Sequence, residues 1–348
     1  MAYPQSETFK KQVRRFHRWG IAALVIVYLV ILAGGIVRMT GSGMGCPDWP
    51  KCFGRLVPPT SESQLPAGWQ ETYKTSCEEE KVFNAANTWT EYINRLIGAI
   101  AGLVVLGLTV VSLPFLKVKG QRWRTLLAGF TLFAILFQAW LGKLVVDSCL
   151  TENMITIHMF VAMLIMCLLI FAIYTSSKPF LVPLNGQRSN LKWVAFATML
   201  LLVSQVLLGT QVREAIDEIA RNMGQEGRSS WVDAAGSIFI IHRTFSWVVA
   251  FAVLFLSWMV IRHARKDTVT KRMAQLGILL VLLEFALGVA LAEFGMPRIA
   301  QPLHLLFGSM LISTTFWLFL AYHIEVDPDA AQISSSPESD DKVELANG

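Results

Sequence analysis

The sequence predicts an all-α polytopic membrane protein with eight transmembrane helices, arranged as two four-helix bundles related by a pseudo-twofold axis. Three observations lead to this fold class. The chain of 348 residues is 54% hydrophobic and only 16% charged, whereas a soluble domain has about 25% charged residues. Its apolar residues gather in runs of about 20, the length that crosses a bilayer. Polar residues recur at matched places in the two halves of the chain.

Eight apolar runs are long enough to span a membrane. The first, residues 19–38, follows a basic segment at 1–18 and has no small-residue cleavage site, so we interpret it as a retained helix and not as a signal peptide. The acidic, Ser-rich tail at 323–348 is predicted to be disordered. The other seven predicted spans cover residues 91–115, 124–146, 153–175, 192–212, 236–261, 273–293 and 299–322.

Basic residues are distributed unevenly over the segments between the spans. The N-terminal segment and the loops 116–124, 175–192 and 261–272 hold 17 Lys and Arg residues, against 9 in the longer alternate loops. Because cytoplasmic loops carry the excess of Lys and Arg, both termini are expected in the cytoplasm. These loops also account for the formal net charge of +5, which requires no nucleic-acid partner.

The first four spans, within residues 19–175 and with an outer loop at 38–90, resemble the last four, within residues 192–322. Parallel repeats of this kind are related by an axis along the membrane normal. The recurring polar positions lie near the outer ends of their helices, so we expect one or more shallow sites facing the extracytoplasmic side. Their offsets are 146 to 148 residues, and they pair Asn94-Arg95 with His242-Arg243 and His158 with His304.

Three of the six histidines lie within predicted spans, where ionisable side chains are rare and usually functional. His242 and His304 are predicted on facing helices of one four-helix bundle, an arrangement that suits axial coordination of haem iron. Zinc fits less well, because it needs three or four close ligands. A histidine that only hydrogen-bonds a neighbouring helix is the alternative for each. The other three lie in or near cytoplasmic flanks beside other charges: His17, His263 and His323.

The first half differs from the second at one of the predicted ligand positions. His158 has Asn94 as its expected partner, and an amide is a poor ligand for haem iron. That half is therefore expected to hold a haem with one protein ligand and an open or water-filled sixth position. Open coordination is required for oxygen chemistry, whereas saturated coordination suits electron transfer.

Glu91 precedes Asn94 by three residues and shares its helix face. The second half keeps the neighbouring arginine but has Phe239 in place of the acid, which favours Glu91 as a proton-handling or charge-stabilising residue beside a reacting group. The alternative is a salt bridge between Glu91 and Arg95 at the helix entry. Three arginines are candidates either for contacts to haem propionates or for interfacial anchors: Arg38, Arg95 and Arg243.

The outer loop after the first span, RMTGSGMGCPDWPKCFG (38–54), contains two cysteines six residues apart. On the oxidising side of the membrane, Cys46 and Cys52 are predicted to form a disulfide, with an electron-passing thiol pair as the alternative. Cys77 and Cys149 both fall in outer loops, which leaves a second disulfide open. Cys167 is at mid-membrane depth, where packing is the expected role.

Several of these stretches closely resemble the haem A synthases: GGIVRMTGSGMGCPDWPKC, EYINRLIGA, IHM, IHR and PLH, over about residues 15–322. The resemblance implies oxidation of the C8 methyl of haem O to a formyl group, giving haem A for terminal oxidases. It also implies a cofactor haem b between His242 and His304, with Arg243 beside it, in the second half.

The resemblance places the substrate haem in the first half, at His158, Asn94 and Arg95, with Glu91 as the catalytic acid. It matches the family's outer cysteine pair to Cys46 and Cys52. This sequence departs from the family pattern in two ways. Asn94 replaces a histidine, and the loop between the fifth and sixth spans has no cysteine pair.

The implied partners are haem O as substrate, an electron donor or acceptor, haem O synthase, a terminal oxidase and membrane lipid. The implied location is the inner (plasma) membrane of the cell. A di-haem b electron-transfer cytochrome is the alternative function, and two bis-histidine sites would favour it. A haem carrier would need polar residues along a path through the membrane, and the inner halves of the spans have almost none.

Overall fold

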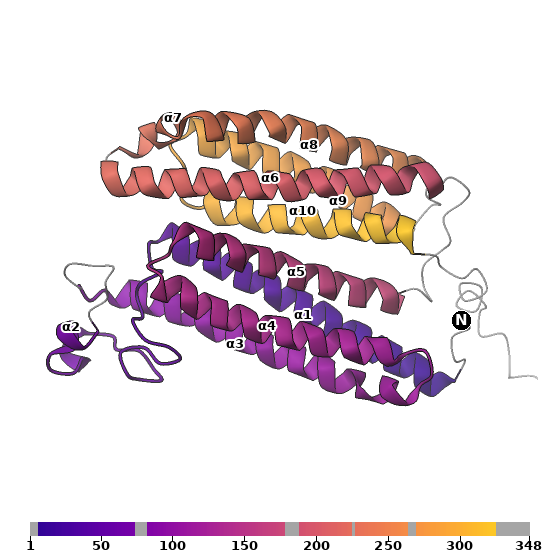
Figure 1. Ribbon diagram of the computed structural model, residues 1–348, viewed down its shortest axis with the longest axis horizontal. Coiled ribbons are helices and arrows are strands. Elements are labelled where there is room, and N and C mark those ends of the chain that lie inside the picture. Colours follow the sequence, from indigo (N-terminus) through magenta and orange to yellow (C-terminus); the bar gives the residue numbers. More distant parts are fainter. Residues whose placement is uncertain (1–5, 74–81, 178–187, 225–226, 264–268, 325–348) are drawn as a thin grey trace, which may run out of the picture.

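The computed structural model describes residues 6–73, 82–177, 188–224, 227–263 and 269–324 (Figure 1). Within these residues eight helices are long and apolar enough to cross a membrane, and no strand occurs apart from one isolated bridge between Cys52 and Arg55. The prediction of an all-α polytopic membrane protein is therefore confirmed. The eight helices are α1 (Glu7–Met39), α3 (Ala85–Ser112), α4 (Arg122–Asp147), α5 (Glu152–Ser177), α6 (Arg188–Met223), α8 (Gly236–His263), α9 (Val269–Glu293) and α10 (Ala300–His323).

Short helical turns lie between the long helices. Helix α2 (Trp69–Thr72) belongs to the outer loop after α1, and α7 (Trp231–Ala234) precedes α8. Three 3₁₀ turns complete the described elements: η1 (Glu62–Gln64), η2 (Leu113–Lys117) and η4 (Arg228–Ser230).

The long helices form two four-helix bundles, one above the other in Figure 1. In the first bundle α1 packs against α3 and α5, and α4 packs against the same two helices. In the second bundle α6 packs against α8 and α10, and α9 packs against the same two helices. The diagonal pairs, α3 with α5 and α8 with α10, make no comparably extensive contact, so they face each other across the interior of their bundle.

The two bundles meet mainly where α10 packs against α1 and α5. The approach of α1 to α10 is close enough to require glycine at position 35, because an added Cβ would lie 2.9 Å from Cβ of Pro302. Nearer the middle of α1 and α10, the Tyr28 hydroxyl donates a hydrogen bond of 2.6 Å to Oγ of Ser313.

At the end of the bundle interface near the disulfide loop, an ion pair joins α1 to α6 and a hydrogen bond joins α5 to α6. Nη2 of Arg38 lies 2.7 Å from Oδ1 of Asp217, and Nε of Arg213 lies 3.4 Å from Oδ2 of the same aspartate. Oγ1 of Thr156 donates to Oε1 of Glu214 at 3.1 Å. One carboxylate on the second bundle therefore pairs with an arginine from each bundle.

Two helices extend well beyond the spans that the hydropathy predicts. Helix α1 begins at Glu7 rather than near residue 19, with Ser6 as an N-cap whose side chain accepts a hydrogen bond from the Phe9 amide. Helix α6 continues to Met223, so much of the expected loop at 212–235 is helical. Polar helix-forming residues continue both helices past their apolar segments, and Ile216 packs against Trp231. Hydropathy locates the apolar segment but not the end of the helix.

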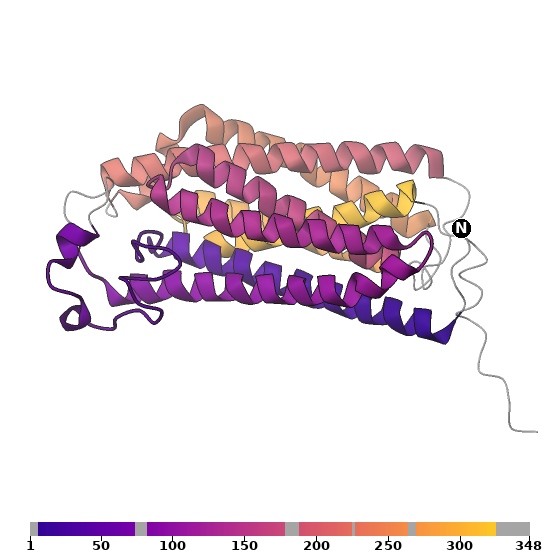
Figure 2. The ribbon, with the colours of Figure 1, turned by 60° about the horizontal axis from the view of Figure 1, so that its bottom comes forward.

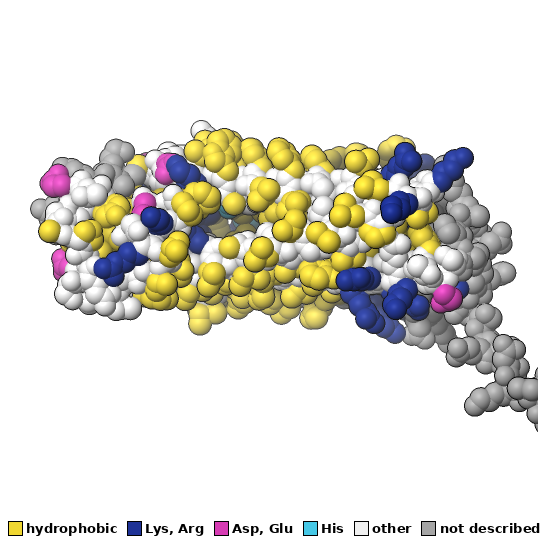
Figure 3. All heavy atoms as spheres, turned by 90° about the horizontal axis from the view of Figure 1, so that it is seen from below, with side chains coloured by type: hydrophobic (Ala, Val, Ile, Leu, Met, Phe, Trp, Pro, Cys, Tyr) yellow, Lys and Arg dark blue, Asp and Glu magenta, His cyan; other side chains and the backbone are white. Residues whose placement is uncertain are grey.

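Apolar side chains cover the middle of the molecule, and Lys and Arg gather toward its ends (Figure 3). Among those on the surface, Leu103, Leu126 and Phe251 are 66%, 69% and 71% exposed. Exposed leucine and phenylalanine over the length of a bundle are expected for a surface that contacts lipid. Helix α1 begins and α10 ends at the same end of the bundles, as Figures 1 and 2 show together. The predicted disordered tail, apart from residues 323 and 324, lies outside the described residues.

Candidate functional site

Each of the four predicted iron-facing residues lies opposite a glycine on a neighbouring helix of its bundle. An added Cβ at any of these glycines would contact the facing side chain, and at Gly209 the contact would be tighter than an ordinary van der Waals contact, so this glycine leaves space for an imidazole. The distances from such a Cβ are 4.0 Å from Gly34 to Oδ1 of Asn94, 3.4 Å from Gly142 to Cε1 of His158, 3.2 Å from Gly209 to Cε1 of His242, and 3.9 Å from Gly288 to Cε1 of His304.

A polar side chain stands one helical turn before three of these glycines. Nε2 of Gln138 donates to the His158 carbonyl oxygen at 3.0 Å, and Nε2 of Gln205 donates to the His242 carbonyl oxygen at 3.2 Å. On α9 the corresponding residue is Glu284, whose Oε2 lies 3.0 Å from Nδ1 of His304. On α1 the corresponding residue is apolar Val30. Asn94 is therefore the exception both in its own chemistry and in its neighbour.

Several polar atoms at these positions are buried without a hydrogen-bond partner. They include Oδ1 of Asn94 and Nδ1 of His158, His242 and His304. Leaving a buried polar atom unpaired costs about 1–3 kcal/mol, so such atoms indicate a site that takes up another group. The described residues contain no group of three or more His, Cys, Asp or Glu side chains placed to hold a metal ion alone. One pair of residues per bundle, on diagonal helices, fits a haem better than a free metal ion.

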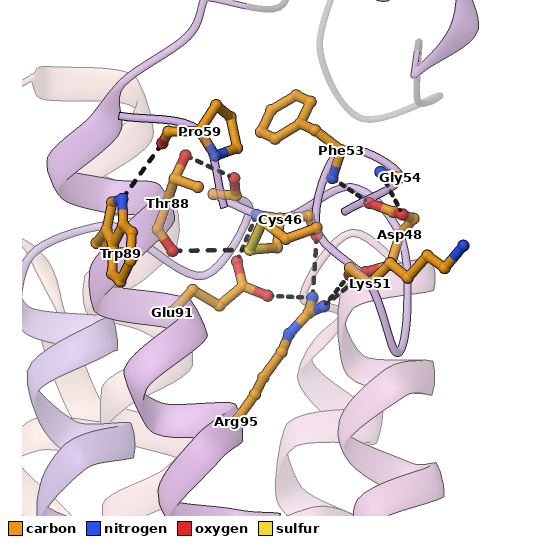
Figure 4. The surroundings of a disulfide bond; sticks show 12 residues. Cys46, Asp48, Lys51, Phe53, Gly54, Pro59, Thr88, Trp89, Glu91 and Arg95 are labelled. Atoms are coloured by element: carbon orange, nitrogen blue, oxygen red, sulfur yellow. Dashed lines mark hydrogen bonds and ion pairs between the residues drawn. A yellow bond between two sulfur atoms is a disulfide. The ribbon is translucent and has the colours of Figure 1, made fainter. Parts of the chain in front are cut away.

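The outer loop carries the predicted disulfide between Cys46 and Cys52, which the structure confirms. Figure 4 shows how this loop is fastened to the outer end of α3. Oε2 of Glu91 accepts a hydrogen bond of 2.9 Å from the Cys46 amide, and Oε1 of Glu91 pairs with the Arg95 guanidinium. The Glu91 side chain is only 5% exposed. Its carboxylate therefore lies between the disulfide loop and α3.

Arg95 continues the same attachment through its other nitrogen–hydrogen groups. It donates to the carbonyl oxygens of Cys46, Asp48 and Lys51, at 3.0, 2.5 and 3.2 Å (Figure 4). The Glu91–Arg95 salt bridge that the sequence offered as an alternative is thus present. Its presence leaves the catalytic role of Glu91 a prediction, because a buried carboxylate can both anchor a loop and stabilise charge.

Close backbone approach explains one glycine of the loop. An added Cβ at Gly45 would lie 2.6 Å from the Asn87 carbonyl oxygen, and Oγ1 of Thr88 donates to the Gly45 carbonyl at 2.9 Å. The disulfide loop therefore rests directly on the first turns of α3, which also carry Glu91.

The remaining predicted site residues are placed apart from the four ligand positions or have partners in the protein. Arg243 is 62% exposed and lies 3.9 Å from Glu293, while Arg38 pairs with Asp217. Contacts of these arginines to haem propionates stay a prediction. Cys149 is disulfide-bonded, and Cys77, its suggested partner, lies outside the described residues. Cys167 is a free, half-buried thiol in α5.

Sequence reasoning found the three histidines and the asparagine but missed the glutamines, Glu284 and the role of the glycines. A signal was available, because Gln or Glu precedes Gly by four residues in α4, α6 and α9. In each case the pair sits inside an apolar run, where one polar residue does not disturb the hydropathy.

Comparison with known proteins places this arrangement in a family. The profile of the family described as cytochrome oxidase assembly protein, COX15-CtaA, matches residues 17–316. A heme A synthase of Shewanella oneidensis is 31% identical over 187 residues, a stretch that covers 53% of either chain. The heme A synthases of Flavobacterium psychrophilum and Orientia tsutsugamushi are each 24% identical, over 85% and 86% of this chain and 95% and 93% of their own.

The family profile covers α3 to α9 in full and most of α1 and α10, and therefore both candidate haem positions. The full-length relatives show that the similarity is not confined to one bundle. A di-haem electron-transfer cytochrome is not favoured by these relatives. The chain belongs to the COX15-CtaA family of cytochrome oxidase assembly proteins, the family of the haem A synthases.

Proposed function

We propose that this protein oxidises the C8 methyl group of haem O to a formyl group and so produces haem A for terminal oxidases. The observation that carries the proposal is the asymmetry of the four glycine-facing positions. Three hold histidine and one holds Asn94, which is a poor iron ligand. One bundle is thereby suited to a permanently coordinated haem, and the other to a haem that undergoes chemistry.

In the second bundle, His242 and His304 are the residues that would hold a haem b. They stand on the diagonal helices α8 and α10, each beside a glycine. Haem b, when bound, supplies one-electron transfer between the reacting haem and an external redox partner. The Gln205 contact to the His242 carbonyl and the Glu284 contact to His304 steady the two helices at this depth.

In the first bundle, His158 would bind the iron of the substrate haem, and Asn94 would leave the opposite position open. Glu91, one helical turn from Asn94, would stabilise positive charge that develops at the reacting carbon, or accept a proton from an attacking water. Arg95 holds Glu91 from the other side and keeps the carboxylate at the outer end of the bundle. With water as the oxygen source, conversion of the methyl to a formyl group releases electrons, which an external acceptor would take up, and protons, for which the Glu91 carboxylate is a candidate acceptor.

The proposed location is the plasma membrane, with both termini in the cytoplasm and the haem positions toward the outer face. The excess of basic residues at the end where α1 begins and α10 ends supports this orientation. Haem O synthase is the proposed supplier of substrate, and a terminal oxidase the proposed recipient of product.

The test is to purify the protein, extract its haem and identify it by chromatography and mass spectrometry. We expect haem B together with haem O, a hydroxylated intermediate or haem A. Substituting His242→Ala or His304→Ala should remove the low-spin haem signal while leaving high-spin haem on the first bundle. Two equivalents of haem B, both low-spin and both redox-active, would contradict the proposal and favour an electron-transfer cytochrome.

A further inference from the structure

One largely buried acidic residue of the second bundle has so far been given only a structural role. Glu284 lies in the apolar middle of α9, and its side chain is 16% exposed. Oε2 of its carboxylate is 3.0 Å from Nδ1 of His304, and the same oxygen would be 3.3 Å from an added Cβ at Gly308. Gly308 follows His304 by one helical turn, so α10 provides both the imidazole that meets the carboxylate and the space in which it lies.

The equivalent position of the first bundle carries an amide. Gln138 precedes Gly142 by four residues, as Glu284 precedes Gly288. Gln138 donates its hydrogen bond to the backbone carbonyl of His158 and leaves Nδ1 of that imidazole without a partner. The two histidines at matched positions differ in what lies beside the imidazole: a carboxylate oxygen 3.0 Å from Nδ1 for His304, and the backbone-directed Gln138 side chain for His158. Nδ1 of His304 makes no hydrogen bond at this geometry, so a small turn of the imidazole ring on binding haem is needed to bring its N–H onto Glu284.

The atom that meets Glu284 is the one that matters for coordination. When Nε2 of a neutral imidazole binds iron, its proton is on Nδ1. An acceptor at Nδ1 fixes the orientation of the ring, and a carboxylate there also raises the basicity of the ligand. A more basic axial ligand stabilises ferric over ferrous iron and binds more firmly.

We propose that Glu284 is a positioning residue. When haem is bound, it accepts the Nδ1 hydrogen of His304 and makes His304 a stronger haem ligand than His158, its counterpart in the first bundle. Gln138 leaves His158 as the weaker ligand, which suits a haem that must enter as substrate and leave as product. This acid-for-amide difference adds to the Asn94 asymmetry in favouring retention of one haem and release of the other. The inference rests on the proposed function, since it assumes a haem on His304.

The first test is Glu284→Gln in the full-length, haem-loaded protein. This variant keeps the side-chain volume and installs the residue that the first bundle uses. We expect the low-spin haem to pass to excess apomyoglobin about tenfold faster than from the parent. The midpoint potential of the low-spin haem should also shift to a more positive value. Ser309→Ala, which removes a buried hydroxyl from α10, the helix that carries His304, is the control and should change neither.

The reciprocal variant is Gln138→Glu, and it keeps the inference testable if Glu284→Gln fails to fold. We expect slower release of the first-bundle haem, because the carboxylate would then meet Nδ1 of His158. In Glu284→Gln, a low-spin haem with unchanged potential and unchanged release would overturn the inference and leave the proposed function standing. A parent protein that holds no low-spin haem would overturn both.

Discussion

The carboxylate of Glu91 meets two partners whose contributions can be separated by substitution. Glu91→Gln keeps an oxygen that accepts from the Cys46 amide but removes the negative charge. We expect the fold and the low-spin haem to survive, and haem A formation to fall by about a hundredfold or more. Haem O or a hydroxylated intermediate should accumulate. The measurement is chromatography with mass detection of haem extracted from cells that express each variant.

Variants of Asn94 are the controls for the Glu91→Gln prediction. Asn94→Ala should cost less activity, because His158 can still bind the iron, and Asn94→His creates a second bis-histidine pair. If Glu91→Gln forms haem A at the parent rate while Asn94→Ala abolishes it, the catalytic role of Glu91 is wrong. Its function would then be to hold Arg95 and the disulfide loop.

At single residues the sequence predicted what was chemically unusual for its surroundings. A histidine or asparagine inside an apolar span stands out, and so did all four glycine-facing residues. Glu284 and Gln205 stand inside apolar runs too, but their meaning depends on which atom they meet. Glu284 lies 3.0 Å from Nδ1 of His304, whereas Gln205 donates to the His242 carbonyl at 3.2 Å and lies 3.5 Å from Nε2 of the same histidine, a difference that packing decides.

At the scale of the helices, the importance of a glycine beside a proposed iron ligand can be tested at Gly209 on α6, which faces His242. Gly209→Leu would push a side chain into the His242 ring, since even a Cβ would lie 3.2 Å from its Cε1. We expect this variant to lose the low-spin haem signal in visible spectra while remaining folded by circular dichroism. Gly129→Leu on α4 is the control, because a Cβ there meets nothing within 4 Å. An unchanged low-spin spectrum in Gly209→Leu would show that His242 does not need this space.

The outer loop is the second element whose role can be measured. Replacing Cys46 and Cys52 by serine removes a short cross-link, worth about 2 kcal/mol to the local structure. We expect faster hydrogen exchange over residues 38–54 and at the start of α3, where Glu91 and Arg95 hold the loop. Mass mapping of the parent without reductant should find the two cysteines joined. Free thiols on both would contradict the disulfide.

The ends of elements were the least predictable part of the helices. The predicted spans for α4, α5 and α8 agree with the structure to within about two residues, whereas α1 and α6 extend much further. Apolar length reflects the thickness of the bilayer, but a helix continues wherever its next residues can form one and find contacts. Ile216 packs in one cluster with Trp231, and no local sequence pattern predicts this contact.

At the scale of the whole molecule, the topology prediction follows from the basic residues between the spans. Reporter fusions placed after Arg55 and after Lys266 should fall on opposite sides of the membrane. A periplasmic reporter should be active only in the first, and a cytoplasmic reporter only in the second. Activity of one reporter at both positions would contradict the assigned orientation.

The arrangement of eight helices in two repeats could be predicted because polar residues recur at matched positions in the two halves of the sequence. The contact between the bundles could not. It depends on Gly35 meeting Pro302 and on Tyr28 reaching Ser313, contacts between residues more than 250 positions apart. Neither pair carries a pattern that identifies its partner, so only the folded chain shows that α10 packs against the first bundle.

Asp217 shows that the two halves do not carry the same charges at the surface where they meet. Arg38 follows Gly34 by four residues and Arg213 follows Gly209 by four, so the arginines are equivalent, and the counterpart of Asp217 is Ser42. Ser42 instead donates to Asn87. Two copies of the first half would bring together two arginines without an acid, whereas two copies of the second would bring two arginines and two acids. The first half therefore depends on Asp217 of the second half to neutralise Arg38, so we expect the first half expressed alone to lack charge balance at this surface.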